Sequence, residues 1–225
     1  MKRVPSVEVG AERVEGERRW PMAVTLIAAM GLPFLLPSGF TFVSSWLAPA
    51  LEGVLLVALI ASDPGRIDRR QASIRVLSVA LVIVLVAGAV VVAVHLVSDI
   101  IRAGPYTSSP TQLLRVGSLV WVYIIISFSF IFWELDGGGP EERLLAPRQF
   151  PDMAFPEQLN PNVAGPGWRP QFFDYLYLGF TNATAFSPTD VMPLARWAKL
   201  LMAIEASGSL VILGLVIARA VNILK

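Results

Sequence analysis

The segment from Ser73 to Ile101 constrains this chain more than any other feature. Its charged residues are Arg75, near one end, and Asp99, near the other, and Val, Leu, Ala and Ile fill most of the rest. A helix that is apolar all round lies either in the centre of a large protein or in a membrane. A chain of 225 residues is too short to bury several such helices in one core. The sequence therefore predicts an integral membrane protein, with the lipid bilayer as a partner.

Composition supports lipid as the solvent and excludes several kinds of chemistry. Hydrophobic residues make up 55% of the chain and charged residues 16%, whereas a soluble domain carries about a quarter charged residues. The net charge of +1 provides no bulk attraction to nucleic acid, so we expect no nucleic-acid partner. The chain has no cysteine and a single histidine, His95, which disfavours thiolate catalysis, metal sites and histidine triads. We expect no enzyme, no metal and no cofactor.

Several apolar segments accompany the first one. The predicted membrane spans cover about residues 21–36, 45–61, 73–101, 113–133 and 193–224, with Pro193 in the first turn of the last span. The first two are near the short end for a span, since about 20 residues are needed. We expect residues 21–62 to form a transmembrane helical hairpin with an uncharged tip, and residues 73–134 to hold two transmembrane helices.

Residues 1–20 are polar and of mixed charge, and we interpret them as an N-terminal arm. A cleaved signal peptide is the competing interpretation, because an apolar segment follows. The charged stretch is long and rich in acids, whereas a signal peptide begins with a short basic stretch. The pattern therefore favours a polar arm.

Composition changes after the fourth span. Residues 134–170 hold seven prolines and five glycines, which forbid a long helix or a central strand. We expect residues 135–171 to form an extramembrane loop. The apolar and aromatic stretch from Phe172 to Thr184 is too short to cross a bilayer and suits a re-entrant or interfacial helix. The predicted fold class is thus an all-α membrane protein with about five transmembrane helices and a short re-entrant, pore-like helix before the last span. The re-entrant helix and the last span both lie within residues 172–225.

Residues 173–184 resemble the pore helix of potassium-channel-type proteins. The residues that stand where those channels have an acidic residue, a proline and the start of the inner helix are Asp190, Pro193, Leu194 and Ala195. The stretch from Glu205 to Gly208, with Gly214, resembles a glycine-bearing inner helix. This resemblance implies a pore-loop ion channel that works as an oligomer, by analogy a tetramer, and passes a monovalent cation.

The filter itself departs from that family. Potassium channels read Thr-Val-Gly-Tyr-Gly, whose glycines let consecutive carbonyls face the ion. Here the stretch from Thr184 to Thr189 reads Thr-Ala-Phe-Ser-Pro-Thr, so both glycines are missing, a proline is present and one residue is inserted. Potassium selectivity by that mechanism is not supported.

The whole chain also resembles a bacterial family of uncharacterised integral membrane proteins. The shared features are the leading hairpin, the arginine-bearing turn of Arg66, Arg69 and Arg70, a proline-rich approach, and an aromatic re-entrant segment that ends in Thr184, Phe186 and Asp190. The last helix ends in Ala-Val-Asn-Ile at residues 220–223, which also fits. The resemblance implies an architecture and a bacterial plasma membrane, and it implies no activity.

The distribution of basic residues predicts the orientation. With five spans, the segments on the side of the N-terminus hold 14 Lys and Arg, and the segments on the other side hold 4. The positive-inside rule then places the N-terminus in the cytoplasm. The pore-like loop would also be cytoplasmic, whereas potassium channels have theirs outside. Either the loop is inverted, the span count is wrong, or the channel likeness is superficial.

The densest group of polar residues follows the re-entrant helix. The pore-like and filter-like residues are Thr181, Asn182, Thr184, Ala185, Phe186, Ser187, Pro188, Thr189 and Asp190. They offer hydroxyls, an amide and carbonyls that could line a path for water or a cation. The alternative is that they cap and connect the turn between two helices.

Polar residues inside predicted spans are the other candidates. Glu205, with Ser209 one turn away on the same face, is either an ion-accessible group or a hydrogen-bonded structural carboxyl. For Glu52 we expect a structural contact, with His95 or a helix neighbour as partner. Asp99, one turn from His95, provides a simple ion pair. A pair between Glu134 and Arg219 is a further hypothesis.

Two classes of function fit these observations. The first is a pore-loop-like membrane protein that passes ions or a small solute. It is expected to be oligomeric, because one loop per chain needs several copies to line a pore. The second is a non-conducting scaffold or accessory subunit that binds a partner through its proline-rich loop.

Overall fold

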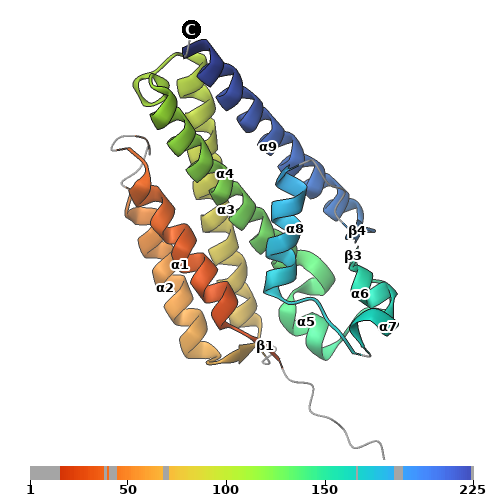
Figure 1. The fold of residues 1–225 in the computed structure, drawn as a ribbon. Helices are drawn as coiled ribbons and strands as arrows, with labels where there is room; N and C mark the ends of the chain where they lie inside the picture. The colour runs from red at the N-terminus through yellow and green to blue at the C-terminus, as the bar shows by residue number, and fades with distance from the viewer. Residues whose placement is uncertain are drawn as a thin grey trace, which may run out of the picture.

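A computed structural model describes residues 16–37, 40, 45–67, 71–165, 167–184 and 190–223. Within these ranges the chain is mainly α-helical, which confirms the predicted all-α class (Figure 1). The helices are α1 (Trp20–Leu35), α2 (Leu47–Ser62), α3 (Ala72–Ile101), α4 (Pro110–Leu135), α5 (Pro140–Leu145), α6 (Pro156–Leu159), α7 (Pro161–Ala164), α8 (Phe172–Thr184) and α9 (Arg196–Ile223). Short 3-10 turns at Pro105–Thr107 and Asp136–Gly138 follow α3 and α4.

Among the described residues, three helices are long and apolar enough to cross a membrane: α3, α4 and α9. They contain 30, 26 and 28 residues and so measure about 45, 39 and 42 Å. Helices α1 and α2 have 16 residues each, or about 24 Å, which is short of a hydrocarbon core of about 30 Å. By helix length and hydropathy, the chain is a candidate multi-pass membrane protein.

The sequence located the helices well, because proline, glycine and charge bound each apolar run. Helix ends lie within three residues of the predicted ends of all five apolar segments. One detail was wrong: Pro193, expected in the first turn of the last helix, lies in strand β4 (Met192–Pro193) and α9 begins at Arg196. The loop also contains more helix than expected, because α5, α6 and α7 each begin at a proline, where the missing N–H has no helical partner to lose.

Helix α4 is the centre of the bundle. In its apolar window 67% of the residues are buried, against 28% in α3 and 28% in α9. Helices α3 and α9 therefore leave much more of their apolar surface exposed than α4 does. Gly117 of α4 lets α9 approach closely, since a methyl group at this position would lie 2.8 Å from the side chain of Val216.

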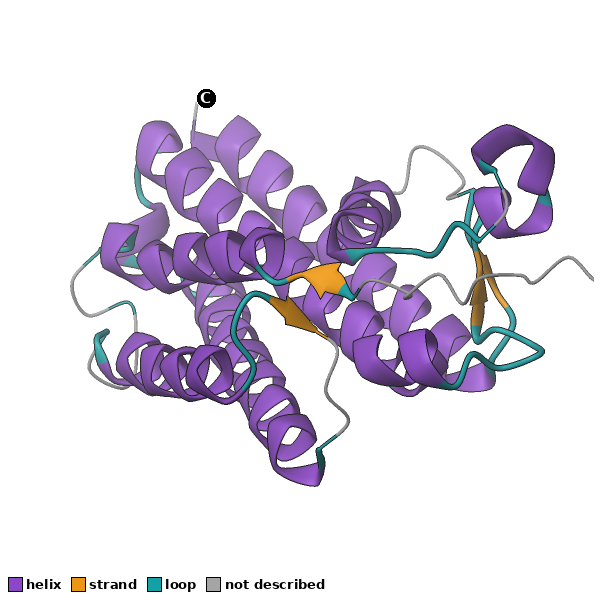
Figure 2. Ribbon diagram, turned by 90° about the horizontal axis from the view of Figure 1, so that it is seen from below, coloured by secondary structure: helices purple, strands orange, loops and turns teal. Residues whose placement is uncertain are grey.

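Two short strand pairs mark one end of the bundle. Strand β1 (Glu17–Arg18) pairs antiparallel with β2 (Arg66–Ile67), and β3 (Met153–Ala154) pairs with β4. Seen from below, the β1–β2 pair lies in the middle and the β3–β4 pair at one side (Figure 2). We call the end of the bundle that carries these two strand pairs the charged end. The α3–α4 connection and the end of α9 lie at the opposite end (Figure 1).

Both ends of the segment around α8 are held near the charged end. The N–H of Phe172, the first residue of α8, donates to the carboxylate of Glu17 in β1. After α8 the chain returns: the N–H groups of Leu194 and Ala195 donate to the carbonyl of Asp152 at 2.9 and 3.0 Å. The Asp152 carboxylate in turn accepts from the N–H of Gly137, just after α4, at 3.1 Å. Thus α8 and α9 both begin near the charged end, where α4 ends.

Candidate functional site

A buried polar cluster lies where α4, α8 and α9 meet. Asn182, near the end of α8, donates from Nδ2 to Glu205 Oε2 at 2.7 Å and to the carbonyl of Met202 at 2.9 Å, both in α9. Glu205 and Ser209 are completely buried, one turn apart on the same face of α9. The structure therefore joins Asn182 to Glu205, two residues that the sequence singled out separately.

Helix α4 contributes Ser129 and the carbonyl of Ile125 to this cluster. Ser129 is buried and its hydroxyl donates to the Ile125 carbonyl at 2.7 Å. Opposite them is Gly179 of α8, where a β-carbon would collide with Ser129 Oγ. The glycine therefore allows α8 to pack directly onto the polar face of α4. We call Ser129, Gly179, Asn182, Glu205 and Ser209 the buried polar cluster.

The two threonines of α8 bond within their own helix. The Thr181 hydroxyl donates to the carbonyls of Tyr177 and Leu178, each at 3.0 Å, and the Thr184 hydroxyl donates to the carbonyl of Thr181 at 2.8 Å. These bonds support the capping interpretation for the two threonines. Asp190 is exposed. The remaining filter-like residues, Ala185, Phe186, Ser187, Pro188 and Thr189, lie outside the described residues.

The predicted pairing of Glu52 with His95 is wrong. Glu52 is completely buried in α2, and neither carboxylate oxygen has a hydrogen-bond partner among the described residues. The imidazole of His95 instead stacks on Phe40, with ring centroids 4.7 Å apart, and meets Tyr106 edge-on at 6.3 Å. Aromatic rings thus surround the His95 imidazole near the end of α3.

Two ion pairs connect helices at the charged end. Arg19 and Asp63 join the start of α1 to the end of α2 at 2.8 Å, with side chains 6% and 2% exposed. Arg75 of α3 lies 3.1 Å from Glu134 of α4, whose other oxygen accepts from Ser78 at 2.5 Å. The hypothesis that Glu134 pairs with Arg219 is therefore wrong. Helices α4 and α9 run antiparallel, which places Arg219 at the opposite end.

Glu17 anchors the N-terminal segment to the same network. Its carboxylate accepts from Trp133 Nε1 at 3.0 Å and from the N–H of Phe172. Burial raises the pKa of the Glu17 carboxyl above its usual value, and the two hydrogen bonds oppose that rise. Phe172 also packs on Trp133, with ring centroids 5.6 Å apart. One acidic side chain thereby links β1, α4 and α8.

Asp136 holds the chain just after α4. Its carboxylate accepts from the Tyr175 hydroxyl of α8 at 2.5 Å and from the N–H of Met153 in β3 at 3.2 Å. Arg143 of α5 donates to the carbonyls of Trp133 and Asp136, both at 2.7 Å, and its guanidinium lies 4.9 Å from the centre of the Tyr175 ring. These contacts hold the N-terminal half of α8, whereas the buried polar cluster holds its C-terminal end.

A crevice of about 570 Å³ lies between α3 and α9, with α4 as its floor. Most of its lining is aliphatic, from Val86 to Ile101 on α3 and from Ile204 to Ile212 on α9. Glu205 borders it, and Arg102 stands at its far end. The crevice therefore borders the buried polar cluster through Glu205.

The pH dependence of stability is expected to depend on Glu141 of α5, outside the long helices. Burial raises the pKa of this carboxyl from 4.5 to about 7, and the neighbouring Glu134 adds to the rise. The folded state therefore favours the protonated form of Glu141. Its stabilising contribution to the free energy of unfolding is fully present below pH 4.5 and is lost as the pH rises through about 7. We expect Glu141→Gln to remove about 1–3 kcal/mol of that dependence in detergent unfolding at pH 4.5–8. Glu142→Gln, one residue along, is the control, and equal curves for Glu141→Gln and the wild type would contradict the prediction.

Comparisons with protein-family models, with curated proteins and with solved structures find no match for this chain. The class of protein therefore rests on the helices themselves, whose length and hydropathy make the chain a candidate helical membrane protein. The described residues include no group of three or more His, Cys, Asp or Glu that could hold a metal ion.

Sequence reasoning missed Ser129 and Gly179. Ser129 stands in a long apolar run of α4, and small or hydroxyl residues in such runs often face another helix. That signal was present, yet it does not say which helix Ser129 meets. The ion pairs of the charged end were missed because they join residues far apart in the chain.

Proposed function

We propose that this chain is a membrane protein of about five spans whose residues 172–195 form a re-entrant loop, and that several copies form a pore for small ions or solutes. The observation that carries the proposal is the path of the chain around α8. Glu17 holds the start of α8, and Asp152 holds residues 194 and 195, near the same end of the bundle. The segment thus enters the bundle and returns without crossing it, as a pore loop does.

The length of α8 supports this interpretation. Thirteen residues measure about 20 Å, or about two-thirds of the hydrocarbon thickness. Its last turn meets α9 at Met202 and Glu205. A helix that ends inside a bilayer leaves carbonyls without helical partners, and these need protein or water around them. The turn after α8 is therefore where we place the pore.

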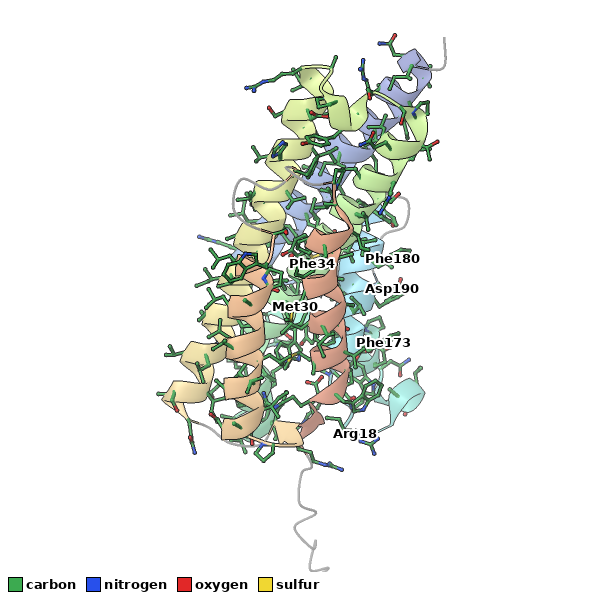
Figure 3. All side chains as sticks on the ribbon, turned by 90° about the vertical axis from the view of Figure 1, so that its left-hand side faces the viewer. Arg18, Met30, Phe34, Phe173, Phe180 and Asp190 are labelled. Atoms are coloured by element: carbon green, nitrogen blue, oxygen red, sulfur yellow. The ribbon has the colours of Figure 1, made fainter. Side chains whose placement is uncertain are left out.

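An uncovered aromatic face on α8 supports assembly into an oligomer. Phe173, Tyr177 and Phe180 are 69%, 57% and 49% exposed and lie about one turn apart. Figure 3 shows Phe173 and Phe180 on the same side of the molecule, beside α1. A second copy would cover this face. The tetramer is proposed by analogy with pore-loop channels.

The proposal places the charged end in the cytoplasm of a bacterial plasma membrane. Basic residues gather at this end, which the positive-inside rule assigns to the cytoplasm. The re-entrant loop then enters from the cytoplasmic side, inverted with respect to potassium channels. Without the two filter glycines, we propose no potassium selectivity.

Flux measurements test the proposal directly. Purified protein in liposomes is expected to carry Na⁺, K⁺ or H⁺ down an imposed gradient, and to run as an oligomer in mild detergent. Asn182→Ala is expected to lower the flux at least about tenfold, because it releases the end of α8 from α9. Glu52→Gln is the matched control, a buried intramembrane acid outside the cluster. No flux under any gradient, together with a monomer, would refute the proposal.

Single cysteines test the topology, since the chain has none of its own. Ser108, between α3 and α4, and Gln149, between α5 and β3, are both exposed and lie at opposite ends of the bundle. We expect a membrane-impermeant maleimide to label Ser108→Cys in intact cells and Gln149→Cys only in opened cells. Labelling of both positions from one side would exclude the proposed path.

A second candidate function is supported by the loop between α4 and α8. It exposes apolar side chains, with Phe150 and Val163 at 76% and 75% and Leu145 and Leu159 at 52% and 56%. A non-conducting scaffold would bind a partner protein there. In that case Phe150→Ser would abolish binding of the partner while Glu205→Ala would leave function intact.

A further inference from the structure

The crevice between α3 and α9 is a space that the described residues leave open. Its volume of about 570 Å³ lies within the range of about 300–1,000 Å³ that is usual for ligand pockets. Small residues on both walls create it, Ala89 and Ala93 on α3 and Gly208 on α9. A β-carbon built on Gly208 would meet no atom within 4 Å. The crevice therefore has room for a ligand.

The polar groups that a ligand can reach lie at one end of the crevice. Among the lining residues the charged ones are Arg102 and Glu205, and Glu205 is 0% exposed. The Ser127 hydroxyl is also buried and donates to the carbonyl of Tyr123 at 2.8 Å. Arg102 and Ser98, one turn before it on α3, are the accessible polar residues of the lining. The crevice is thus an aliphatic channel with a cation at one end.

The guanidinium of Arg102 is available to a ligand. Arg102 is exposed, and no described residue forms an ion pair or a hydrogen bond with its side chain. Asp99, the nearest acid along the chain, is 8% exposed and does not line the crevice. A guanidinium presents its N–H donors in a planar fork that matches the oxygens of a phosphate. This end of the crevice therefore suits a phosphate group.

The crevice has the length of one lipid leaflet. Its α3 wall begins at Val86, in the middle of that helix, and ends at Arg102, directly after the last helical residue. The helix rises about 24 Å between these two residues. One leaflet of a bilayer, with its headgroups, is about 20–22 Å thick. With α3 spanning the bilayer, Arg102 lies at the level of the headgroups and Val86 near the midplane.

We propose that this crevice binds one anionic phospholipid, with its phosphate on Arg102 and an acyl chain between α3 and α9. The bilayer already dissolves acyl chains, so the aliphatic walls select the shape of the lipid, whereas Arg102 selects a negatively charged headgroup. The lipid belongs to the leaflet at the α3–α4 connection, opposite the charged end. The inference requires that α3 crosses the bilayer, and it is independent of whether the chain conducts ions.

Native mass spectrometry of the purified full chain tests the charged end of the site. The protein is titrated with phosphatidylglycerol or with phosphatidylcholine of the same acyl chains, and one phosphatidylglycerol per chain is expected to bind at least about tenfold more tightly. Arg102→Gln should remove this preference, because it removes the charge-assisted hydrogen bonds to the phosphate. Arg115→Gln is the matched control, an exposed arginine of α4 near the same end and outside the crevice, and should bind like the wild type.

Two glycines of α9 test the aliphatic part. Gly208→Leu fills the crevice and should weaken phosphatidylglycerol binding about tenfold. Gly214→Leu is the control, since a β-carbon there also meets no atom within 4 Å and Gly214 does not line the crevice. Both changes raise helix propensity, so both variants should fold.

Three results would overturn the lipid site. The first is equal affinity of the wild type for the two lipids. The second is an equal loss of binding in Arg102→Gln and Arg115→Gln, which would show a general attraction of basic residues to anionic lipid. The third is a wild-type dimer that Gly208→Leu converts to a monomer, which would assign the crevice to a second copy of the chain.

Discussion

Asp63→Ala is expected to lower the free energy of unfolding by about 3–5 kcal/mol, the largest effect of any single substitution considered. The substitution removes the partner of Arg19, whose side chain is 6% exposed and whose Nη2 donates to Asp63 at 2.8 Å. The guanidinium would remain buried between α1 and α2 without its counter-charge. Urea or SDS unfolding of the protein in mixed micelles measures the change.

A double variant separates the cost of an unpaired charge from the value of the pair. Arg19→Met with Asp63→Leu replaces both charges by apolar side chains of similar size and is expected to recover most of the lost stability, to within about 1–2 kcal/mol of the wild type. A cost below about 1 kcal/mol for Asp63→Ala would show that water reaches the pair, as in a surface ion pair.

Asp136→Ala is expected to cost about 3 kcal/mol and to release the loop between α4 and α8. The carboxylate accepts from the Tyr175 hydroxyl and the Met153 N–H, and both donors are buried. Each donor left unpaired costs about 1–3 kcal/mol. Loss of the Met153 bond also weakens the β3–β4 pair that precedes α9.

Tyr175→Phe is the matched control for this prediction. It removes one hydrogen bond and keeps the ring against Phe155 and Arg143, so about 1 kcal/mol is expected. Limited proteolysis between residues 146 and 170 should accelerate in Asp136→Ala and stay near the wild-type rate in Tyr175→Phe. Equal rates and equal stabilities in the two variants would mean that Asp136 serves Tyr175 alone.

The helices could be predicted because their signals are local. Apolar runs end at prolines, glycines or charges, and the short length of Phe172–Thr184 already separated α8 from the longer apolar helices. The direction of each helix could be derived too. Counting spans places the end of α4 and the end of α9 on opposite sides, which was sufficient to reject a Glu134–Arg219 pair.

The contacts between helices could not be derived in the same way. Glu205 was noticed as an acid in an apolar helix, but the identity of its partner depends on the rotation of α8 about its axis. That rotation is set by Gly179 and Ser129, two small residues whose meeting no sequence pattern specifies. The same holds for Glu17, whose partners Trp133 and Phe172 follow it by 116 and 155 residues.

The position of Glu17 early in the chain has a consequence for membrane insertion. Strand β1, α1 and α4 leave the ribosome before α8, so the carboxylate and the indole that hold Phe172 exist before the helix they hold. At 13 residues α8 is too short for a membrane span, so its position depends on the surface that the preceding elements form. The order of synthesis thus matches the order of docking, and the N-terminal segment acts as an early-made anchor for α8.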